Sequence, residues 1–299
     1  MNKKNTIIPA LILSSQVTFA ENKLPTPSPH EFNLKTHTVL LNSGYKMPLN
    51  GIGTWAISDK QAEKSVYLAL KAGARLIDTA HIYGNEAGVG RAVKRSGVPR
   101  SEIFITTKLW YSDYEDVPAA VDAMLKRLGT DYIDLLLLHY TADNDVAAYK
   151  GMEECVRSGK VRSIGLSNFY EADFDRIMAA AEITPAVLQN ETHPYNQQKA
   201  MKAYVKKYGT VFESWYPLGG RGHTQVLFAD PTIAKIAKAH KKSPAQVILR
   251  WHLQAGNVVM PGATNPAHIK ENTELYDFSL TDSEMEQMNS LDKKQTFGG

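Results

Sequence analysis

The sequence predicts an α/β protein whose fold class is a single-domain (β/α)8 barrel of the TIM type. Three observations lead to this prediction. Short apolar segments alternate with helical patterns from about residue 37 onward. Continuous apolar segments, such as residues 135–138, are typical of parallel strands that helices cover on both faces. The alternation spans about 240 residues, close to the size of about 250 residues that such barrels usually have.

The predicted strands are rich in apolar and β-branched residues and follow one another at regular intervals. They are residues 49–54, 75–79, 103–107, 132–139, 162–166, 186–189, 211–215 and 258–260. Between them, apolar residues recur with helical spacing. The predicted helices are residues 59–72, 88–96, 117–128, 147–158, 171–181, 197–208, 231–240 and 244–254.

A doubly wound open sheet is the alternative architecture for such an alternation. That fold usually carries a Gly-x-Gly-x-x-Gly turn after its first strand. Gly51 and Gly53 match the first two glycines of this turn, but Ala56 stands at the third position. The barrel is therefore favoured.

Composition excludes several classes of protein. With 43% hydrophobic and 22% charged residues among 299, the chain is not collagen-like, coiled-coil or wholly disordered. Lys and Arg number 34 against 31 Asp and Glu, and this net charge of +3 gives no reason to expect nucleic-acid binding. Cys155 is the only cysteine, which excludes an internal disulfide and a multi-cysteine metal site. We predict a monomer that holds no metal.

The first twenty residues differ from the rest of the chain. Lys3 and Lys4 precede sixteen residues without a charged side chain, with an apolar centre at residues 7–13 and small residues, Thr18 and Ala20, at the end. This order is typical of a secretory signal peptide. The seven apolar residues are too few for a membrane anchor, which needs about 20.

These features predict three segments, with a periplasmic or secreted location for the mature protein. They are a signal peptide at 1–20, a proline-containing linker at 21–36 that belongs to no core, and the barrel at 37–299. The alternative is a cytoplasmic protein with an N-terminal extension.

Polar side chains stand at the ends of three neighbouring predicted strands. Asp78 ends the second strand with Tyr83 just beyond it, and Lys108 follows the third. His139 ends the fourth strand. Because the carboxyl ends of barrel strands meet at one rim, we expect these four side chains to converge.

Each of the four also has a purely structural explanation, as a helix cap, a surface ion pair, a core histidine or a rim aromatic. Together they can move a proton. A phenol with a pKa of about 10 needs a nearby cation to donate and recover a proton near neutrality, and Lys108 can supply that cation. Asp78 can pair with Lys108, and His139 can hydrogen-bond the reacting oxygen.

A set of motifs, in order and spacing from about residue 37 to 292, resembles the aldo-keto reductase family. They are residues 51–55 (GIGTW), 78–86 (DTAHIYGNE), 108–110 (KLW), 159–169 (GKVRSIGLSNF), Gln189 with 193–195 (HPY), 217–219 (PLG) and 244–251 (PAQVILRW). Among the branches of the family, the chain is most similar to the bacterial 2,5-diketogluconate reductase type.

This resemblance implies a barrel that binds NAD(P)H and reduces small aldehydes or ketones by hydride transfer. It implies that Tyr83 is the general acid, that Lys108 and Asp78 tune it, and that His139 orients the carbonyl. Further cofactor contacts implied by the resemblance are Gly53, Thr54, Asp78, Ser167, Asn168, Gln189, Trp215, Leu218, Gly219, Glu271 and Asn272. Trp55, Trp110 and His139 are implied on the wall of the substrate pocket, and Trp215 is alternatively a core residue of its strand.

The chain departs from the family pattern in two places. The loop after His139 is short, which predicts an open substrate pocket. Gly262, Ala263 and His268 replace the Lys, Ser and Arg that commonly hold the 2′-phosphate of NADP, so we expect little preference for NADPH over NADH. Export and these losses leave a second hypothesis open, an exported barrel that binds or senses a cofactor with little or no turnover.

Overall fold

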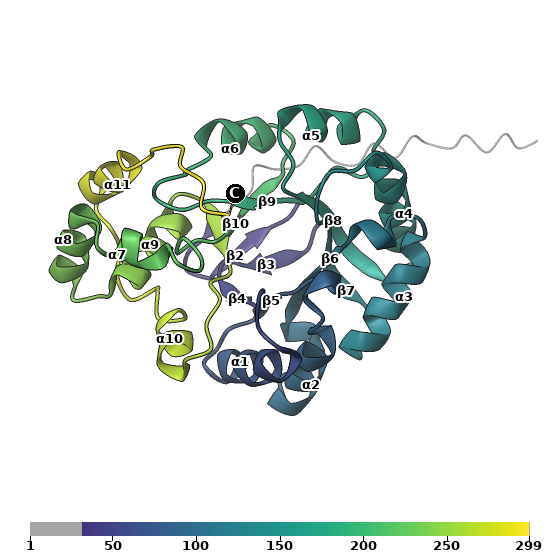
Figure 1. The fold of residues 1–299 in the computed structure, drawn as a ribbon, viewed down its shortest axis with the longest axis horizontal. Coiled ribbons are helices and arrows are strands. Elements are labelled where there is room, and N and C mark those ends of the chain that lie inside the picture. The colour runs from purple at the N-terminus through teal and green to yellow at the C-terminus, as the bar shows by residue number, and fades with distance from the viewer. Residues whose placement is uncertain (1–31, 299) are drawn as a thin grey trace, which may run out of the picture.

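Eight parallel strands form a barrel with helices around it (Figure 1). The computed structural model describes residues 32–298. The strands are hydrogen-bonded in chain order as β4 (Gly51–Gly53), β5 (Leu76–Asp78), β6 (Phe104–Leu109), β7 (Ile133–Leu138), β8 (Val161–Ser167), β9 (Val187–Glu191), β10 (Val211–Trp215) and β11 (Asn257–Val259). Bridges from Asn50 to Val259 and from Gly53 to Gly262 bring the last strand against the first. The predicted single-domain (β/α)8 barrel is confirmed.

The first six helices surround the strands in chain order, whereas the last one lies back beside the eighth (Figure 1). They are α1 (Asp59–Lys71), α2 (Glu86–Ser96), α3 (Val117–Leu128), α4 (Asp145–Arg157), α5 (Glu171–Met178), α6 (Lys199–Lys206), α7 (Thr224–Phe228), α8 (Pro231–His240), α9 (Pro244–Gln254), α10 (Pro266–Glu271) and α11 (Asp282–Asn289). The eight predicted helices are present within three residues of their expected ends, the usual uncertainty at helix termini. Ser58 and Ser243 begin α1 and α9 with capping boxes that satisfy the free N–H groups of the first turn.

Helices α7, α10 and α11 were not predicted. The first two have five and six residues, which is too few turns for a clear period, and α11 buries only Met288 and so has no apolar face to reveal it. The start of α11 does carry a local signal. Thr281 and Glu284 form a capping box there.

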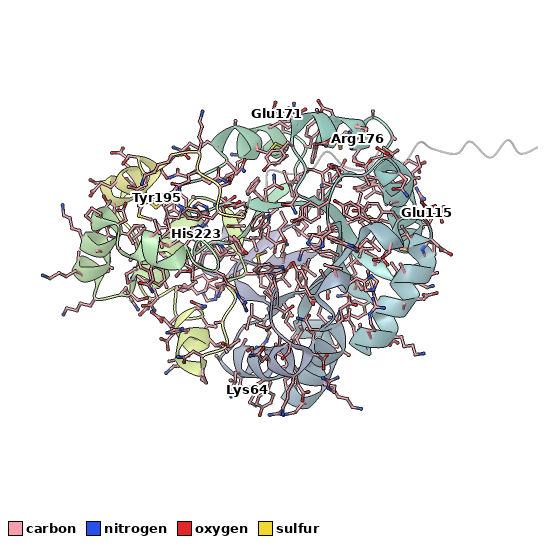
Figure 2. All side chains as sticks on the ribbon, viewed as in Figure 1. Lys64, Glu115, Glu171, Arg176, Tyr195 and His223 are labelled. Carbon is pink, nitrogen blue, oxygen red and sulfur yellow. The ribbon has the colours of Figure 1, made fainter. Side chains whose placement is uncertain are left out.

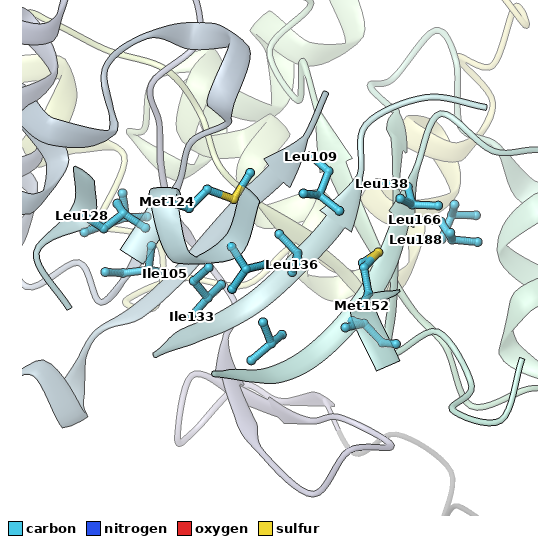
Figure 3. Close-up of a cluster of buried hydrophobic side chains, with 14 of the residues drawn as sticks. Ile105, Leu109, Met124, Leu128, Ile133, Leu136, Leu138, Met152, Leu166 and Leu188 are labelled. Carbon is cyan, nitrogen blue, oxygen red and sulfur yellow. The ribbon is translucent and has the colours of Figure 1, made fainter. Parts of the chain in front are cut away.

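Strand alternation separates two apolar layers, of which Figure 3 draws the outer one. Leu136 and Leu138 of β7 face outward and pack in one cluster with Met124 of α3 and Met152 of α4. Their neighbours Leu135 and Leu137 belong to the cluster inside the barrel. The inner cluster fills the amino-terminal part of the barrel, which leaves the inward positions near the carboxyl ends for polar residues.

A small antiparallel sheet closes the amino-terminal end of the barrel. Its strands are β1 (Phe32–Asn33), β2 (Thr38–Leu40) and β3 (Lys46–Pro48). Val39 and Met47 pack in one cluster with Leu76, Phe104 and other residues from the starts of barrel strands.

This sheet corrects one expected boundary. Phe32 and Asn33, which the prediction assigned to a linker outside any core, pair with β2, and Phe32 packs on the inner cluster. Strands of two or three residues carry no readable alternation, so the sequence pattern could not reveal them. The expected signal peptide at 1–20 and residues 21–31 of the linker lie outside the described residues. Between residues 32 and 298, no helix is both long and apolar enough to cross a bilayer.

Candidate active site

A cavity of about 900 Å³ opens at the carboxyl ends of the barrel strands. Asp78, Tyr83 and His139 line one end of it. Gly262 and His268, from the segment after β11 and from α10, line the other. The cavity therefore joins the predicted catalytic residues to the segment where the family pattern is lost.

Lys108 is the centre of the catalytic end. Its Nζ donates to both carboxylate oxygens of Asp78, at 2.7 and 2.8 Å, and to the carbonyl oxygen of Thr79 at 3.0 Å. The same Nζ lies 3.4 Å from the hydroxyl of Tyr83. Lys108 is fully buried behind Asp78 and Tyr83 and does not itself line the cavity. The predicted convergence of these three side chains is present.

Burial controls the protonation of this group. Burial raises the pKa of Tyr83 to about 12, and the opposing effect of the Lys108 charge is smaller. Burial alone would lower the pKa of Lys108, but Asp78 and Tyr83 together raise it to about 12. Near neutral pH, Lys108 is therefore a cation. Tyr83 is a protonated phenol and is not close to ionisation.

His139 lies beside Tyr83, with 5.7 Å between the ring centroids. It stacks on Tyr140 and contacts Trp110 edge-on. Burial and the nearby Lys108 charge lower the pKa of His139 to about 3, so the imidazole is neutral. Its Nδ1 has no hydrogen-bond partner within residues 32–298. A neutral imidazole can donate a hydrogen bond into the cavity from one nitrogen.

Amide and hydroxyl side chains continue along the barrel wall. Gln189 donates from Nε2 to Asp78 at 2.9 Å and to Glu213 at 2.8 Å. Asn168 donates to Ser167 Oγ at 3.1 Å and accepts from the indole nitrogen of Trp215 at 2.9 Å. Two amides, a hydroxyl and a flat aromatic ring thus form one connected wall of the cavity.

Most of the predicted contacts line this cavity, and a few do not. Those that do include Gly53, Trp55, Ser167, Asn168, Gln189, Trp215, Leu218, Gly262, Ala263, His268, Glu271 and Asn272. Thr54, Trp110 and Gly219 do not line it. Thr54 is turned inward and donates to the carbonyl oxygen of Asp78.

Sequence patterns missed several lining residues in the loop after β10. Tyr216 packs edge-on against Trp55, and Arg221 donates to the carbonyl oxygen of Ala56 at 2.6 Å. These two contacts connect the β10 loop to the β4 loop. Their side-chain directions depend on the loop conformation, which local composition does not determine.

The segment after α11 returns to the cavity. The carboxylate of Glu191 accepts from the backbone N–H groups of Phe297 at 2.5 Å and Gly298 at 3.2 Å. The Phe297 ring stacks between His193 and His223, with 4.4 Å to each ring centroid. His223 is labelled in Figure 2, on the side of the barrel where α7 and α9 lie. Gly298 consequently lies against the ring of Trp215.

Glu213 was also missed. It is fully buried in the middle of β10, and burial followed by the charge of Asp78 raises its pKa to about 8. A glutamate directly after the apolar pair Val211 and Phe212 was the available signal. Within the described part of the chain, no three His, Cys, Asp or Glu side chains are grouped so as to hold a metal ion.

Comparison with known proteins identifies the family. A model of the Aldo/keto reductase family matches residues 49–293. The chain is 42% identical over 272 residues to morphine 6-dehydrogenase of Pseudomonas putida, covering 86% of this chain and 92% of that enzyme. It is 39% identical over 271 residues to 9,11-endoperoxide prostaglandin H2 reductase of Trypanosoma cruzi, covering 89% and 95%.

Solved structures agree with these relatives. An aldo/keto reductase from Brucella melitensis has a TM-score of 0.81 at 45% identity, covering 85% of this chain and 99% of that one. An aldo-keto reductase from a Medee basin deep-sea metagenome library has a TM-score of 0.84 at 40% identity, covering 87% and 98%. Together the relatives support an enzyme over a barrel without turnover. The chain belongs to the aldo-keto reductase family and is an NAD(P)H-dependent oxidoreductase that reduces aldehydes or ketones to alcohols.

Proposed function

We propose that Tyr83, Lys108, Asp78 and His139 carry the carbonyl reduction, and that the enzyme has little preference for NADPH over NADH. The contact that supports the first part is Lys108 Nζ, which touches Asp78 and Tyr83 together. Purified protein, NADH or NADPH and a panel of aldehydes and ketones provide the test. The absence of cofactor oxidation with every pair would overturn the proposal.

The residues around the cavity fit a nicotinamide cofactor. Ser167, Asn168 and Gln189 offer donors and acceptors to a carboxamide, and Trp215 offers a flat ring for stacking. A Cβ on Gly53 would lie 2.8 Å from the carbonyl oxygen of Met260, so β4 packs closely against the adjacent segment after β11 at this wall. Leu218, Glu271 and Asn272 would contact the rest of the dinucleotide. When bound, the reduced nicotinamide supplies the hydride.

The protein side of the reaction follows from the protonation states. Tyr83 is protonated at neutral pH and donates its proton to the oxygen of the substrate as the alcohol forms. Lys108 is positively charged and stabilises the phenolate that Tyr83 becomes, because Nζ already lies beside the hydroxyl. Asp78 holds Lys108 in this position. Neutral His139 orients the carbonyl oxygen by a hydrogen bond without competing as an acid.

The substrate end favours carbonyl compounds with an apolar, ring-bearing part. Trp55, Tyr140 and Tyr216 line it, and Trp55 and Tyr140 are exposed to the cavity opening. Broad apolar walls with a few polar groups are the usual form of small-molecule sites. The short segment between β7 and α4 leaves this opening uncovered by a long loop.

Cofactor preference rests on the opposite end of the cavity. A 2′-phosphate carries close to two negative charges and is normally held by Lys or Arg. Gly262 and Ala263 offer no side-chain donor, and Glu271 adds a carboxylate to this end. Lys270 does not line the cavity, and its Nζ lies 3.6 Å from Glu274. Each missing charge-assisted hydrogen bond costs about 1.5–3 kcal/mol of NADPH affinity.

Dissociation constants for NADPH and NADH, measured at one ionic strength, test this preference. We expect NADPH to bind less than about tenfold more tightly than NADH, since every 1.4 kcal/mol is a factor of about ten. NADPH binding about a hundredfold more tightly would show that another residue holds the phosphate.

Export of the mature protein is part of the proposal. The basic, apolar and small-residue order of residues 1–20 supports it. Mass spectrometry of the protein from its native host should find a mature N-terminus at or near Glu21. Recovery of the intact N-terminus from the cytoplasm would refute export.

A further inference from the structure

Glu213 is a fully buried carboxylate of the barrel interior that the reaction above does not use. It lies at the centre of β10, paired in register with Gln189 of β9 and with Val258 of β11. It is fully buried, and its Oε2 accepts from Gln189 at 2.8 Å. A buried acidic group is costly unless it serves a structural or chemical purpose.

The contacts of Glu213 determine how Gln189 is oriented. Gln189 Nε2 donates one hydrogen to Asp78 and the other to Glu213. An amide has two N–H donors, so both are now used, and its oxygen remains as a free acceptor. If the amide were reversed, the amide oxygen of Gln189 would face the carboxyl groups of Asp78 and Glu213. The ionised Asp78 would repel this oxygen.

We propose that Glu213 is a positioning residue for the nicotinamide: with Asp78 it fixes the Gln189 amide so that Gln189 Oε1 accepts a hydrogen bond from the cofactor carboxamide, and it does this as a neutral acid at pH 7. The proposal rests on the proposed function, since it needs the nicotinamide at this wall. It assigns Glu213 no contact with the substrate.

Geometry supports the neutral form of Glu213. Lys108 of β6 is the one cation of this group, and Asp78 of β5 already takes both of its short contacts. Glu191 of β9 is a further carboxylate on the same wall, and β11 presents Val258 at this level. Glu213 Oε1 has no hydrogen-bond partner within the described residues. An ionised oxygen left in this way is far more costly than a protonated one.

Neutral Glu213 gives a stability signature that needs no cofactor. Its pKa of about 8 is above that of an unfolded glutamate, about 4.3. Between these values the folded state binds one proton more than the unfolded state, so folding stability falls as pH rises. Above about pH 8, Glu213 is ionised in both the folded and the unfolded protein, so its titration no longer lowers folding stability. Glu213→Gln removes the titration, so the melting temperature of the wild type should fall relative to this variant from pH 5 to 8.

Cofactor affinity gives a second signature. Above pH 8 the ionised Glu213 places a negative charge on the wall that holds the nicotinamide. This charge favours the positively charged ring of NAD⁺ over the neutral ring of NADH. At an effective dielectric constant of about 20, a unit charge within about 12 Å corresponds to a change of about tenfold or more. The ratio of the NADH to the NAD⁺ dissociation constant should rise by about that factor from pH 6.5 to 9.5.

The decisive comparison uses the full-length wild type, Glu213→Gln and Glu213→Leu, with tryptophan fluorescence to measure both dissociation constants. Glu213→Gln should bind both cofactors like the wild type at pH 6.5, because its own amide oxygen can accept from Gln189, and its ratio should not change with pH. Glu213→Leu should bind both cofactors about five- to tenfold more weakly, since Gln189 loses one acceptor. Rescue by Gln but not by Leu is not expected from a residue that only fills space.

Glu153→Gln is the matched control, because Glu153 is also buried but lies on α4 and binds the backbone of residues 182 and 183. It should keep the wild-type ratio at every pH. Lys202 of α6, whose pKa burial lowers to about 8, titrates in the same range in all variants and cancels in the comparison. The proposal is wrong if, in Glu213→Gln, the ratio of the two dissociation constants and the melting temperature change with pH as they do in the wild type. Binding of neither nucleotide to the wild type would instead overturn the proposed function.

Discussion

The two ends of the cavity are built in opposite ways. At the catalytic end, Asp78, Lys108 and Glu213 are buried inside the barrel, and each hydrogen-bonds a further polar side chain. The opposite end, where the adenine half of the cofactor would bind, is called the adenine end. There, Gly262 and His268 are exposed on the segment after β11 and on α10. The first end is a connected network within the core, whereas the second is a surface loop beside a six-residue helix.

This difference explains why the chain keeps one half of the family pattern and loses the other. A change in the buried network leaves a polar partner unsatisfied, so it affects folding and chemistry together. A change in an exposed loop affects ligand binding and has little effect on folding. Catalysis is therefore tied to the fold, and cofactor selectivity is free to vary.

The largest expected effect tests the catalytic end. Tyr83→Phe removes the proton donor and should lower kcat by about 10²–10⁴-fold. Cofactor dissociation constants should remain close to those of the wild type, because the hydroxyl acts in the transition state and not on the nicotinamide. Steady-state kinetics and fluorescence titration check both values. A kcat of Tyr83→Phe equal to that of the wild type would show that Tyr83 is not the proton donor.

The second prediction tests whether the buried network is tied to the fold. Lys108→Met leaves the Asp78 carboxylate buried without its counterion and should lower the free energy of unfolding by about 3–5 kcal/mol. Adding Asp78→Asn removes the unpaired charge, so the double variant should recover much of this loss. Urea denaturation measures all three proteins. A double variant no more stable than Lys108→Met would contradict the argument.

Much of the fold follows from sequence because its signals are long and repeated. Residues 135–138 are four consecutive leucines, and the strand lies at residues 133–138. The hairpin strands of two or three residues have no such repetition and were missed. The convergence of Asp78, Tyr83, Lys108 and His139 could be predicted because strand ends define a position in a barrel even when side-chain contacts are unknown.

Side-chain direction limits the remaining predictions. Alternation along residues 211–215 does not say which face of the strand is the interior, so Glu213 could equally have faced the helices. Trp110 and Gly219 stand in loops, where position along the chain does not determine which way a residue points, and neither lines the cavity. Such residues need the three-dimensional arrangement.

The third prediction tests the adenine end. Gly262→Lys combined with His268→Arg places two cationic side chains on the segment after β11 and on α10. NADPH should then bind at least about tenfold more tightly relative to NADH, the effect of one charge-assisted hydrogen bond at an exposed site. The free energy of unfolding should change little, because both positions are exposed. An unchanged ratio of the two dissociation constants would mean that the phosphate does not reach this segment.

The smallest expected effect comes from Ala263→Ser, which adds one neutral hydroxyl to the same segment. A neutral hydrogen bond contributes about 0.5–1.5 kcal/mol, so the shift toward NADPH should be about two- to tenfold and smaller than that of the charged pair. Ala263 lines the cavity and is partly buried, so the added oxygen can face the ligand without opening the core. The same fluorescence titrations, run in low and high salt, separate the two variants. Salt should reduce the shift produced by Lys and Arg, because it screens exposed charges, and should leave the shift produced by Ser nearly unchanged. A serine shift equal to that of the charged pair would mean that the lost hydroxyl, and not the lost charge, sets the preference of this enzyme for its cofactor.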